Sequence, residues 1–521
     1  MPSSTTASQS TLKLHPSDDV MIALSELEAG TPLSDEDSSQ SLTTTATIPP
    51  GHKLAIRAIA EGEPVRKYGQ IIGYATTAIQ PGDWVHQHNL ACGSVTLDYA
   101  ISSDVPPPPQ AKQQKTFLGY RRPDGKAATR NYIAVISTVN CSATVAKRVA
   151  RKIAETDLSN YPNIDGIVPL VHQGGCSFAF NSADHQQLNK VLAGYAKHPN
   201  IGGYLIVGLG CEAAQPDYLF DSHNLVALDY PGRTEFPQRP VMSIQDFGGI
   251  EQTIERAATA LSELLPVVND VQRVPIPASE LILGTECGGS DGYSGLTANP
   301  AIGVASDLLV AQGGTSIISE VTEIFGGEHL LTRRAINEQV GQKLIDRIQW
   351  WEEYAAKFDC HLNNNPSDGN KKGGLTTIFE KSLGAVAKAG STALIDVYGY
   401  AEPVTAKGLV VMDTPGFDPA SVTGMIAGGA HVIVFSTGRG SCFGSKPSPT
   451  IKIATNSTMF QRMKTDMDLD AGTILTGSSV QQVGEEIFDQ ILKVASGEQT
   501  KSEAQGLGDE EFVPWIPGPV F

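Results

Sequence analysis

Five of the seven cysteines come just after short apolar runs of the sequence. Uninterrupted runs of Val, Ile and Leu are typical of β-strands buried on both faces. The five are Cys141, Cys176, Cys211, Cys287 and Cys442. A thiolate is a good ligand for a transition metal or an iron–sulfur centre. Because Cys is also a small residue that often fills a buried strand end, packing is the favoured explanation for any one cysteine taken alone, and it is weaker for the set.

Glycines and ionisable residues accompany three of these cysteines. The loops are HQGGCS, GLGCE and ECGGSDGYSG, and they bring His172, Glu212, Glu286 and Asp291 close in sequence to Cys176, Cys211 and Cys287. Ligands bind at the carboxyl edge of parallel sheets, so we expect these loops to converge there on one site. No Cys-x-x-Cys spacing is present. Any metal site must therefore be assembled by the fold.

Histidines and lysines outside these loops form a second group of candidates. His86 and His88 stand two residues apart in a β-like run, so both side chains face the same way, and His52 precedes them. This arrangement suits metal binding or proton transfer, and the alternative is that these histidines are solvated. Lys371 and Lys372 stand in the loop NPSDGNKKGG, where they either bind a carboxylate or face solvent.

One loop also permits a different chemistry. The segment from Gly208 to Ala213, GLGCEA, resembles the glycine-rich turn of dinucleotide-binding proteins, and Asp229 stands at a suitable distance to bind a ribose. A dinucleotide-dependent oxidoreductase is therefore the alternative from the residues. Pro216 and the Cys-Glu pair argue against it, because a pyrophosphate needs unobstructed helix N–H groups.

The elements that position these loops follow from the apolar runs. Strands are predicted at 132–138, 166–171, 204–209, 225–228, 280–285, 315–320, 392–398, 408–412 and 431–437, and clear helices at 332–358 and 479–496. Strands that alternate with helices predict parallel pairing, so the fold class is α/β.

The residue composition and the apolar pattern change at three points along the chain. Short β-like runs between Gly and Pro predict a small all-β domain at 12–100, followed by a Pro-rich linker at 101–116. An α/β domain with the Cys- and Gly-bearing loops is predicted at 117–365, and a second α/β domain at 366–521, because a polar Gly-rich loop lies between them.

Charge and hydropathy exclude several classes of partner. The net charge of −18 disfavours binding to nucleic acid or to an anionic membrane surface. No apolar run approaches the ~20 residues of a membrane span. The N-terminal segment has neither a secretory core nor Arg, and the odd number of cysteines fits a reducing compartment, so a cytoplasmic location is expected.

Several motifs in order give the sequence a wider resemblance. They are GHKLAI, KYGQIIGYA, GYRRPDGKAATRNY, HQGGC, GLGCE, ECGGSDGYSGLTANPAIG, SEVTEIFG, NPSDGNKKGG, FSTGRGS and IKIATNS. Through them the chain resembles the altronate/galactarate dehydratase family along nearly its whole length, and VHQHN and EIFGGEHLL are closer to the altronate branch. The first domain resembles the family's SAF (β-clip) module. The segment RGSCFG departs from the family's pattern, which affects the choice of substrate.

The resemblance implies a hydro-lyase that converts an aldonate or aldarate into a 2-keto-3-deoxy acid. It also implies a divalent metal, iron(II) first and manganese(II) as the alternative, with an iron–sulfur centre left open. A metal that chelates the carboxylate and a hydroxyl stabilises the intermediate formed when a base removes the proton next to the carboxylate. A small-molecule sugar acid is the expected partner, and the chain is compatible with a homo-oligomer.

On this basis we assign hypothetical roles to fifteen residues. The catalytic candidates are His52, His172, Lys371 and Glu212. The substrate-binding candidates are Arg130, Asn131, Lys372, Arg439 and Ser290. The metal-binding candidates are His86, His88, Cys176, Cys211, Cys287 and Asp291. A protein that binds sugar acids without turnover remains a further alternative, although no DNA-reading module is present to serve as its output.

Overall fold

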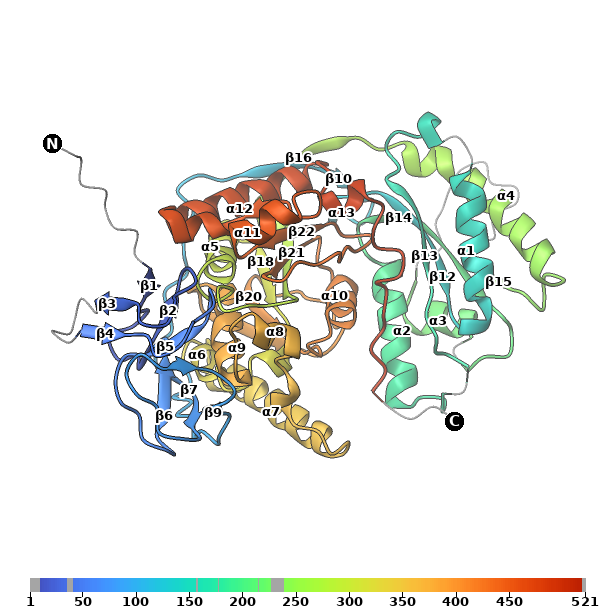
Figure 1. Cartoon of the computed structure of the whole chain (residues 1–521). Helices are drawn as coiled ribbons and strands as arrows, with labels where there is room; N and C mark the ends of the chain where they lie inside the picture. The colour runs from blue at the N-terminus through green and yellow to red at the C-terminus, as the bar shows by residue number, and fades with distance from the viewer. Residues whose placement is uncertain are drawn as a thin grey trace.

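The computed structural model describes residues 10–34, 41–155, 158–176, 178–213, 215–225 and 239–517. Figure 1 shows three regions: a small β domain at the N-terminus, a central α/β region, and a second α/β region beside it. The C-terminal helices return to the top of the central region. This arrangement confirms the predicted all-β domain followed by mainly parallel α/β structure.

The first domain consists of short antiparallel strands. One sheet has the order β1-β2-β5-β8, with β1 (Thr11–Leu12), β2 (Val20–Ala23), β5 (Lys53–Ala55) and β8 (Trp84–Val85). A second has the order β6-β7-β9, with β6 (Pro64–Lys67), β7 (Gln70–Ala75) and β9 (Leu90–Ala91), and β3 (Pro32–Ser34) pairs with β4 (Ser41–Thr43). Buried side chains such as Val20, Ile72 and Val85 form its core.

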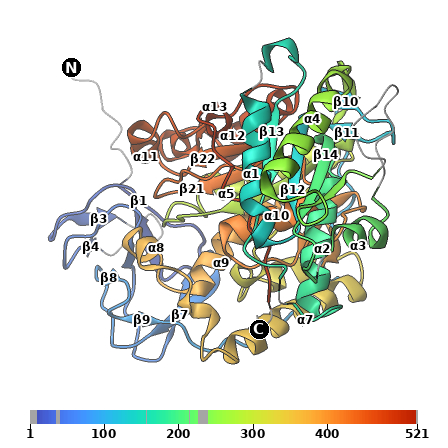
Figure 2. The same cartoon turned by 90° about the vertical axis from the view of Figure 1, so that its right-hand side faces the viewer.

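The second region is built on a parallel four-stranded sheet. Its order is β13-β12-β14-β15, with β13 (Gly166–Leu170), β12 (Tyr132–Ser137), β14 (Ile201–Gly208) and β15 (Val241–Ser243). Ile133 and Val135 face α1 (Asn140–Ala154) and α4 (Ile250–Asn269), which Figure 2 shows side by side. Ala134 and Ile136 face the other side, where α2 (Ala183–Ala196) and α3 (Pro216–Ser222) pack. Because helices cover both faces of the sheet, the sequence of β12 is a continuous apolar run.

The chain enters and leaves this region through a pair of antiparallel strands. β10 (Thr116–Arg121) pairs with β16 (Arg273–Pro277), and the short β11 (Ala127–Ala128) adds to β10. The entry and exit strands therefore hold the second region at one end. Of the predicted strand at 225–228, residues 226–228 lie outside the described residues, as does Asp229.

The central region contains a parallel seven-stranded sheet. Its order is β19-β20-β18-β17-β21-β22-β23. The strands are β17 (Ile282–Cys287), β18 (Thr315–Ile318), β19 (Leu394–Tyr398), β20 (Gly408–Met412), β21 (Val432–Thr437), β22 (Thr450–Ala454) and β23 (Leu469–Asp470). The boundary predicted at 365/366 is wrong, because β17 and β18 precede it and pair with strands that follow it. The prediction rests on the polar Gly-rich loop at that position, and such loops also occur inside domains.

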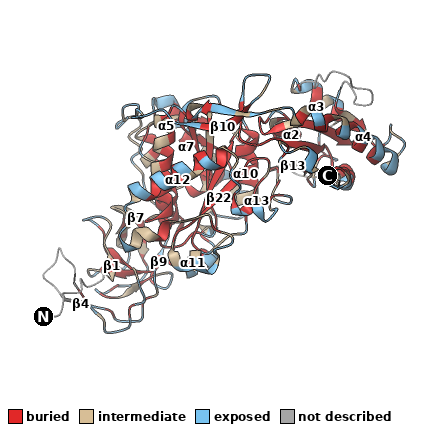
Figure 3. Ribbon diagram, turned by 90° about the horizontal axis from the view of Figure 1, so that it is seen from above, coloured by how far each residue is buried: buried red, intermediate tan, exposed pale blue. Residues whose placement is uncertain are grey.

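Helices cover both faces of this sheet. α5 (Ala298–Ala311) and α12 (Val480–Ala495) pack on one face, and α10 (Asp418–Ala427) packs on the other. Figure 3 shows the buried residues concentrated around α5, α10 and β22. The remaining helices are α6 (His329–Thr332), α7 (Glu338–Ala356), α8 (Asp368–Lys372), α9 (Ile378–Val386), α11 (Ser457–Arg462) and α13 (Lys501–Ala504). No described helix is long and apolar enough to cross a membrane.

The two α/β regions share one core. Gly194 of α2 lies against Ala427 of α10 so closely that a Cβ at Gly194 would be 2.5 Å from the Ala427 carbonyl oxygen. The C-terminal segment then runs along this contact. Phe512 packs on Tyr195 with ring centroids 4.8 Å apart, and Trp515 stacks on Trp351 at 4.9 Å. These contacts join the second region to the central one.

Candidate active site and neighbouring pockets

A cluster of charged side chains is buried at the carboxyl end of β17 and β18. The Cys287 thiol lies 3.7 Å from Glu320 Oε1 and 3.6 Å from Glu323 Oε2. All three side chains are buried. β17 and β18 are parallel neighbours, so Cys287 and the segment after β18 meet at one edge. Sequence reasoning chose Cys287 and missed the two glutamates, although Glu320 ends the strand predicted at 315–320 and Glu323 follows it.

Two lysines neutralise these glutamates. Lys381 of α9 donates to Glu323 Oε1 at 2.6 Å, and Lys388, which follows α9, forms an ion pair with Glu320. The four side chains are between 1% and 7% exposed. Charges that far from water require partners, so each glutamate holds one lysine and each lysine one glutamate. Neither lysine stands out in the sequence, because both lie inside an ordinary helical pattern.

Two carboxyl groups with raised pKa values complete the cluster. Burial, followed by the charges of Glu320 and Asp418, raises the pKa of Glu286 well above its usual range. Its Oε2 accepts hydrogen bonds from Ser319 and Ser421 at 3.0 and 2.7 Å. Burial, followed by the charges of Glu320 and Glu323, raises the pKa of Asp418 to about 7. Asp418 can therefore both accept and release a proton near neutral pH.

A cavity of about 260 Å³ opens onto this cluster. Its walls are Cys287, Gly288, Gly289, Glu323, Asn364, Asn365, Ser367, Asn370, Lys381, Gly416 and Asp418. Two of its glycines lie close to these carboxyl groups: a Cβ at Gly288 would lie 2.2 Å from Asp418 Oδ2, and one at Gly416 would lie 2.9 Å from Glu323 Oε1. The cavity thus places an ammonium group, an amide and a titratable carboxyl group around a small space.

The thiol and the two glutamates fit a divalent metal. Among the described residues, Cys287, Glu320 and Glu323 form the one group of three His, Cys, Asp or Glu side chains whose ligand atoms lie within 4.8 Å of one another. Each glutamate turns one oxygen to its lysine and the other to the thiol. A tetrahedral ion with a metal–sulfur bond of ~2.3 Å and metal–oxygen bonds of ~2.1 Å needs sulfur–oxygen separations of about 3.6 Å. The observed separations of 3.6 and 3.7 Å match this requirement.

The first domain forms a second pocket on the far side of α8. Ser367 and Asn370 border the cavity at Cys287, whereas Asp368, Lys371 and Lys372 line a separate pocket of about 410 Å³. The other walls of that pocket are Pro49, His52, Trp84, His86 and Gln87. The fold thus brings the predicted His52, His86, Lys371 and Lys372 together. It does not bring them into the cavity at Cys287.

The histidines of this pocket are held neutral. His52 Nδ1 accepts from the Trp84 indole at 3.2 Å, and His52 Nε2 lies 3.3 Å from the Lys372 carbonyl oxygen. Burial, followed by the charge of Lys53, lowers the pKa of His52 to about 4. The same causes, followed by His52, lower the pKa of His86 to about 3. His88 is exposed with its ring 5.4 Å from that of Trp84, and the predicted pairing of His86 and His88 gains no third ligand among the described residues.

A buried ion cluster joins the first domain to the central region. Lys53 and Lys67 each lie 2.9 Å from a carboxylate oxygen of Glu380, and all three side chains are at most 1% exposed. The backbones of the first domain and the central region also come close together, since a Cβ at Gly292 would lie 2.0 Å from the Gly51 carbonyl oxygen. Because Glu380 precedes Lys381 in α9, the first domain packs directly behind the cavity wall.

Three further predicted residues lie near the cavity in different roles. Asp291 is buried and accepts from Thr455 Oγ1 at 3.0 Å and from Asn456 Nδ2 at 3.1 Å, so it anchors a loop and is not available as a metal ligand. Ser290 is buried, and its carbonyl oxygen accepts from Asn370 at 2.8 Å. Arg439 has an exposed side chain, and its backbone N–H donates to Gly289 at 2.9 Å.

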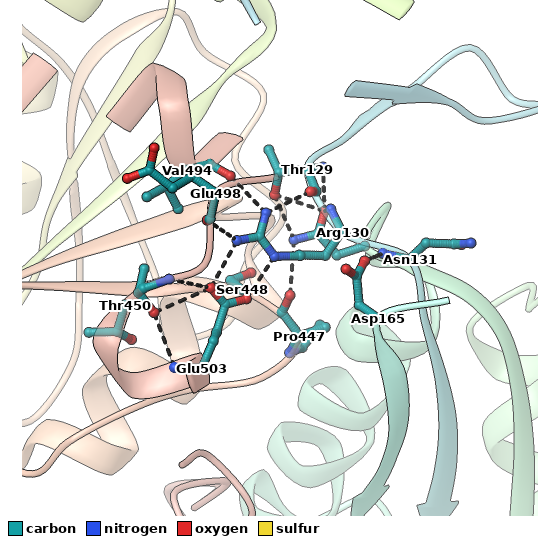
Figure 4. A network of polar contacts seen from close by, with 12 residues as sticks. Thr129, Arg130, Asn131, Asp165, Pro447, Ser448, Thr450, Val494, Glu498 and Glu503 are labelled. Atoms are coloured by element: carbon teal, nitrogen blue, oxygen red, sulfur yellow. Dashed lines mark hydrogen bonds and ion pairs between the residues drawn. The ribbon is translucent and has the colours of Figure 1, made fainter. Parts of the chain in front are cut away.

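Arg130 and Asn131 are not substrate-binding residues. Figure 4 shows Arg130 surrounded by Glu503 and by the carbonyl groups of Thr129, Val494 and Glu498. These contacts use all five guanidinium N–H groups. The Asn131 amide donates to the Asn163 and Val268 carbonyl oxygens at 2.7 and 2.9 Å. Both residues come just before β12, at the amino end of its sheet and opposite the edge where ligands bind.

The remaining predicted residues lie at the edge of the other sheet. His172 Nε2 is 2.9 Å from the Ser137 carbonyl oxygen and its Nδ1 accepts from Gly174 N–H at 3.2 Å, and burial lowers the pKa of His172 to about 4. Glu212 accepts from Thr138 Oγ1 at 2.8 Å and from two backbone N–H groups. Both side chains support loops, so neither is free for catalysis.

Cys176 and Cys211 do not share a sheet edge with Cys287. They follow β13 and β14 of the four-stranded sheet, whereas Cys287 ends β17 of the seven-stranded sheet. The expectation that all three converge on one site is therefore wrong. The dinucleotide interpretation of GLGCEA also fails, because Glu212 occupies the N–H groups of Leu209 and Gly210 that a pyrophosphate would need.

Comparisons with known proteins agree with this architecture. Three family models match in order: the altronate/galactarate dehydratase SAF domain at residues 9–93, the D-galactarate dehydratase/altronate hydrolase second domain at 119–269, and the D-galactarate/altronate dehydratase C-terminal domain at 278–520.

Three relatives are similar over almost the whole chain. Altronate dehydratase of Escherichia coli is 37% identical over 94% of this chain and 96% of its own. Galactarate dehydratase (L-threo-forming) of the same organism is 38% identical over 98% of this chain and 97% of its own. Altronate dehydratase of Bacillus subtilis is 34% identical over 95% of this chain and 97% of its own.

Proposed function

The chain belongs to the altronate/galactarate dehydratase family, and from this premise we propose that the cavity beside Cys287 is where it removes water from a sugar acid. The enzyme is a hydro-lyase. In the proposed reaction a base removes the proton at C2, the C3 hydroxyl leaves as water, and the enol becomes a 2-keto-3-deoxy acid. No electrons are transferred, so no redox cofactor is required.

The observation that carries this proposal is the meeting of Lys381, Asn365 and Asp418 in one cavity. A sugar acid presents a carboxylate. Lys381 donates to Glu323 and to Asn365 Oδ1, and Asn365 Nδ2 donates to Glu323 at 2.7 Å, so each side chain keeps one further N–H with which it can bind that carboxylate. Asp418 is the base, because a pKa of about 7 allows it to be ionised at neutral pH and still to bind a proton well.

Cys287, Glu320 and Glu323 are the proposed ligands of the divalent metal. When bound, the ion would stabilise the negative charge of the enolate and of the departing hydroxide. A thiolate among the ligands favours iron(II), with manganese(II) as the alternative, over a harder ion such as magnesium. The predicted metal roles of His86, His88, Cys176, Cys211 and Asp291 are not part of this site.

The substrate is an aldonate or an aldarate of the altronate or galactarate type. The relatives that carry these two names are 37% and 38% identical to the chain, so similarity favours neither. The predicted involvement of His52, Lys371 and Lys372 stays a prediction. They line the pocket behind α8, which is the alternative place for the reaction or for a distant part of the substrate. A cytoplasmic location and a homo-oligomer also stay predictions.

The test uses protein purified without oxygen and loaded with iron(II). A panel of aldonates and aldarates is supplied, and the 2-keto-3-deoxy product is measured by mass and by carbonyl trapping. Asp418→Asn is expected to lower kcat by roughly 10²–10⁴-fold, the usual contribution of a positioned base. Asp489→Asn, an exposed carboxylate on α12, is the matched control. Full activity of Asp418→Asn, or a larger loss in Lys371→Ala, would move the reaction out of this cavity.

Metal content separates the ligands from the base. Cys287→Ser is expected to lower the bound iron(II), as measured by elemental analysis of the desalted protein, whereas Asp418→Asn is expected to retain it. Unchanged iron content in Cys287→Ser would contradict the proposed ligand set.

A further inference from the structure

Three exposed thiols follow three neighbouring strands at the carboxyl edge of the four-stranded sheet. Cys141 follows β12, Cys176 follows β13 and Cys211 follows β14. In this sheet β12 lies between β13 and β14, so the three loops are neighbours. All three thiols are free and exposed. Cysteine is otherwise among the most buried residue types, and packing does not explain three exposed ones at one edge.

Hydrogen bonds hold the three loops together. The Asn140 N–H donates to the Gly174 carbonyl oxygen at 3.0 Å, which ties the loop of Cys141 to that of Cys176. Thr138 Oγ1 donates to Glu212 Oε1 at 2.8 Å, which ties the loop of Cys141 to that of Cys211. The three cysteines therefore stand on one fixed scaffold.

Two buried side chains serve only this scaffold. Glu212 is 3% exposed, and its contacts lie within its own loop and with Thr138. His172 is 7% exposed and fixes the third loop to the end of β12 through the Ser137 carbonyl oxygen. Gly175 permits the close approach, with φ +97° and space so limited that a Cβ would lie 2.4 Å from the Thr138 carbonyl oxygen. Buried polar groups used in this way indicate that the position of the loops matters.

We propose that Cys141, Cys176 and Cys211 bind an iron–sulfur cluster, with one iron left without a protein ligand. A single ion would need the three sulfur atoms close together, and among the described residues only the group at Cys287 is that tight. A cluster of several irons holds its thiolates further apart, which suits three separate strand ends. Cys141 is also the second residue of α1, whose first turn has no acidic residue, and the positive end of a helix favours an anionic cluster.

This cluster is distinct from the metal site proposed at Cys287. Its ligands belong to another sheet and another part of the chain, and its scaffold residues do not border the cavity of Lys381 and Asp418. The iron without a protein ligand would accept an oxygen ligand such as a hydroxyl or a carboxylate group.

The test is reconstitution of the full-length chain with iron(II) and sulfide in the absence of oxygen. We expect about five irons and four sulfides per chain, four of the irons in the cluster and one at the site of Cys287, with the broad visible absorption of a four-iron cluster. Cys141→Ser, Cys176→Ser and Cys211→Ser are each expected to lose most of the sulfide and the colour. Cys360→Ser, which removes another exposed thiol, is the matched control and should keep both. Circular dichroism establishes that each variant is folded.

Two outcomes would overturn the cluster. One is the absence of sulfide-dependent iron binding in the full-length chain, and the other is retention of the colour in all three serine variants. Cys287→Ser should keep the sulfide and lose only the additional iron(II). A chain that dehydrates sugar acids with iron(II) alone and binds no sulfide would retain the proposed function and exclude the cluster.

Discussion

The two sheet edges of this enzyme use the same position of the fold in opposite ways. At the end of β17, Cys287 is buried among two glutamates and two lysines in ion pairs. At the ends of β12, β13 and β14, three cysteines are exposed, and the buried His172 and Glu212 bond to the loops around them, His172 to the backbone and Glu212 to the backbone and the Thr138 hydroxyl. The position of a cysteine after a parallel strand therefore does not determine the chemistry of its thiol. Burial of the thiol and the charges of its neighbours determine that chemistry.

The two edges also respond to acid in opposite directions. Burial and nearby carboxylates raise the pKa of Asp418 to about 7, whereas burial lowers the pKa of His172 to about 4. Acid therefore removes charge from the edge at β17, and it forces charge onto buried imidazole at the other edge. The first effect favours the folded state at low pH and the second opposes it.

Lys381→Met should produce the largest loss of activity. The substrate carboxylate loses its cationic partner and Glu323 loses its counter-ion, so we expect kcat/KM to fall by roughly 10³-fold or more. Steady-state kinetics with the preferred sugar acid measure this loss. Lys493→Met, an exposed lysine on α12, is the matched control. If Lys381→Met is as active as the control, the edge at β17 is not the reaction site.

The same Glu→Gln change should destabilise the two edges unequally. Glu320→Gln leaves the Lys388 ammonium group buried without a counter-ion, and we expect a loss of about 3–5 kcal/mol in the free energy of unfolding. Glu212→Gln keeps an oxygen that accepts from Thr138 and Leu209 and loses only the acceptor of the neutral Gly210 N–H, so about 1–2 kcal/mol is expected. Urea denaturation at pH 7.5 measures both losses. Equal losses of unfolding free energy in the two variants would contradict the claim that Glu320 is held by a buried ion pair and Glu212 by neutral partners.

Acid should destabilise the four-stranded sheet through His172. Its pKa is 6.5 when unfolded and about 4 when folded, so the folded state binds fewer protons between these values. The stability from His172 is complete above pH 6.5 and falls as the pH drops toward 4, by roughly 3 kcal/mol at most. Hydrogen exchange of β12–β14 between pH 7.5 and 5 measures this effect. The pH dependence of hydrogen exchange in β12–β14 should be smaller in His172→Gln. If it is unchanged in that variant, other groups cause it.

The pH dependence of kcat is the smallest expected effect. If Asp418 is the base, its ionised form is active, so kcat should fall tenfold per pH unit below the pKa of Asp418 and level off above it. The charges of Glu320 and Glu323 help to raise that pKa to about 7, and iron(II) bound to these two carboxylates would lower it. The measurement uses iron-loaded enzyme at saturating substrate. Asp418→Glu should keep some activity and shift this limb. A profile that stays flat from pH 8 down to about 4, the ordinary pKa of an aspartate, would give the role of base to another group.

Much of the fold could be predicted from the sequence because its patterns are local. The apolar run 132–138 predicts a strand covered on both faces, and β12 is covered by α1 and α4 on one side and by α2 on the other. The antiparallel first domain follows equally from short β-like runs between turn residues. The boundary at 365/366 was wrong because a polar loop has the same composition inside a domain as between two domains.

The candidate site was less predictable. Cys287 was found because it ends a strand, but Lys381 and Lys388 lie in helices whose pattern is ordinary. Their importance comes from the glutamates opposite them, which lie some 60 residues away in the chain. Arg130 was misassigned because a guanidinium group suits a substrate carboxylate as well as it suits Glu503.

The sequence by itself determined that strands end in loops with Cys, Gly and ionisable residues, because strand periodicity and loop composition are properties of adjacent residues. Only the tertiary structure decided which sheet each loop belongs to, which charges are paired, and that α8 separates the histidines of the first domain from the cavity at Cys287. The physical reason is that an apolar run specifies burial on both faces without specifying its neighbours. Strand order and ion pairing arise from contacts between segments far apart in the chain.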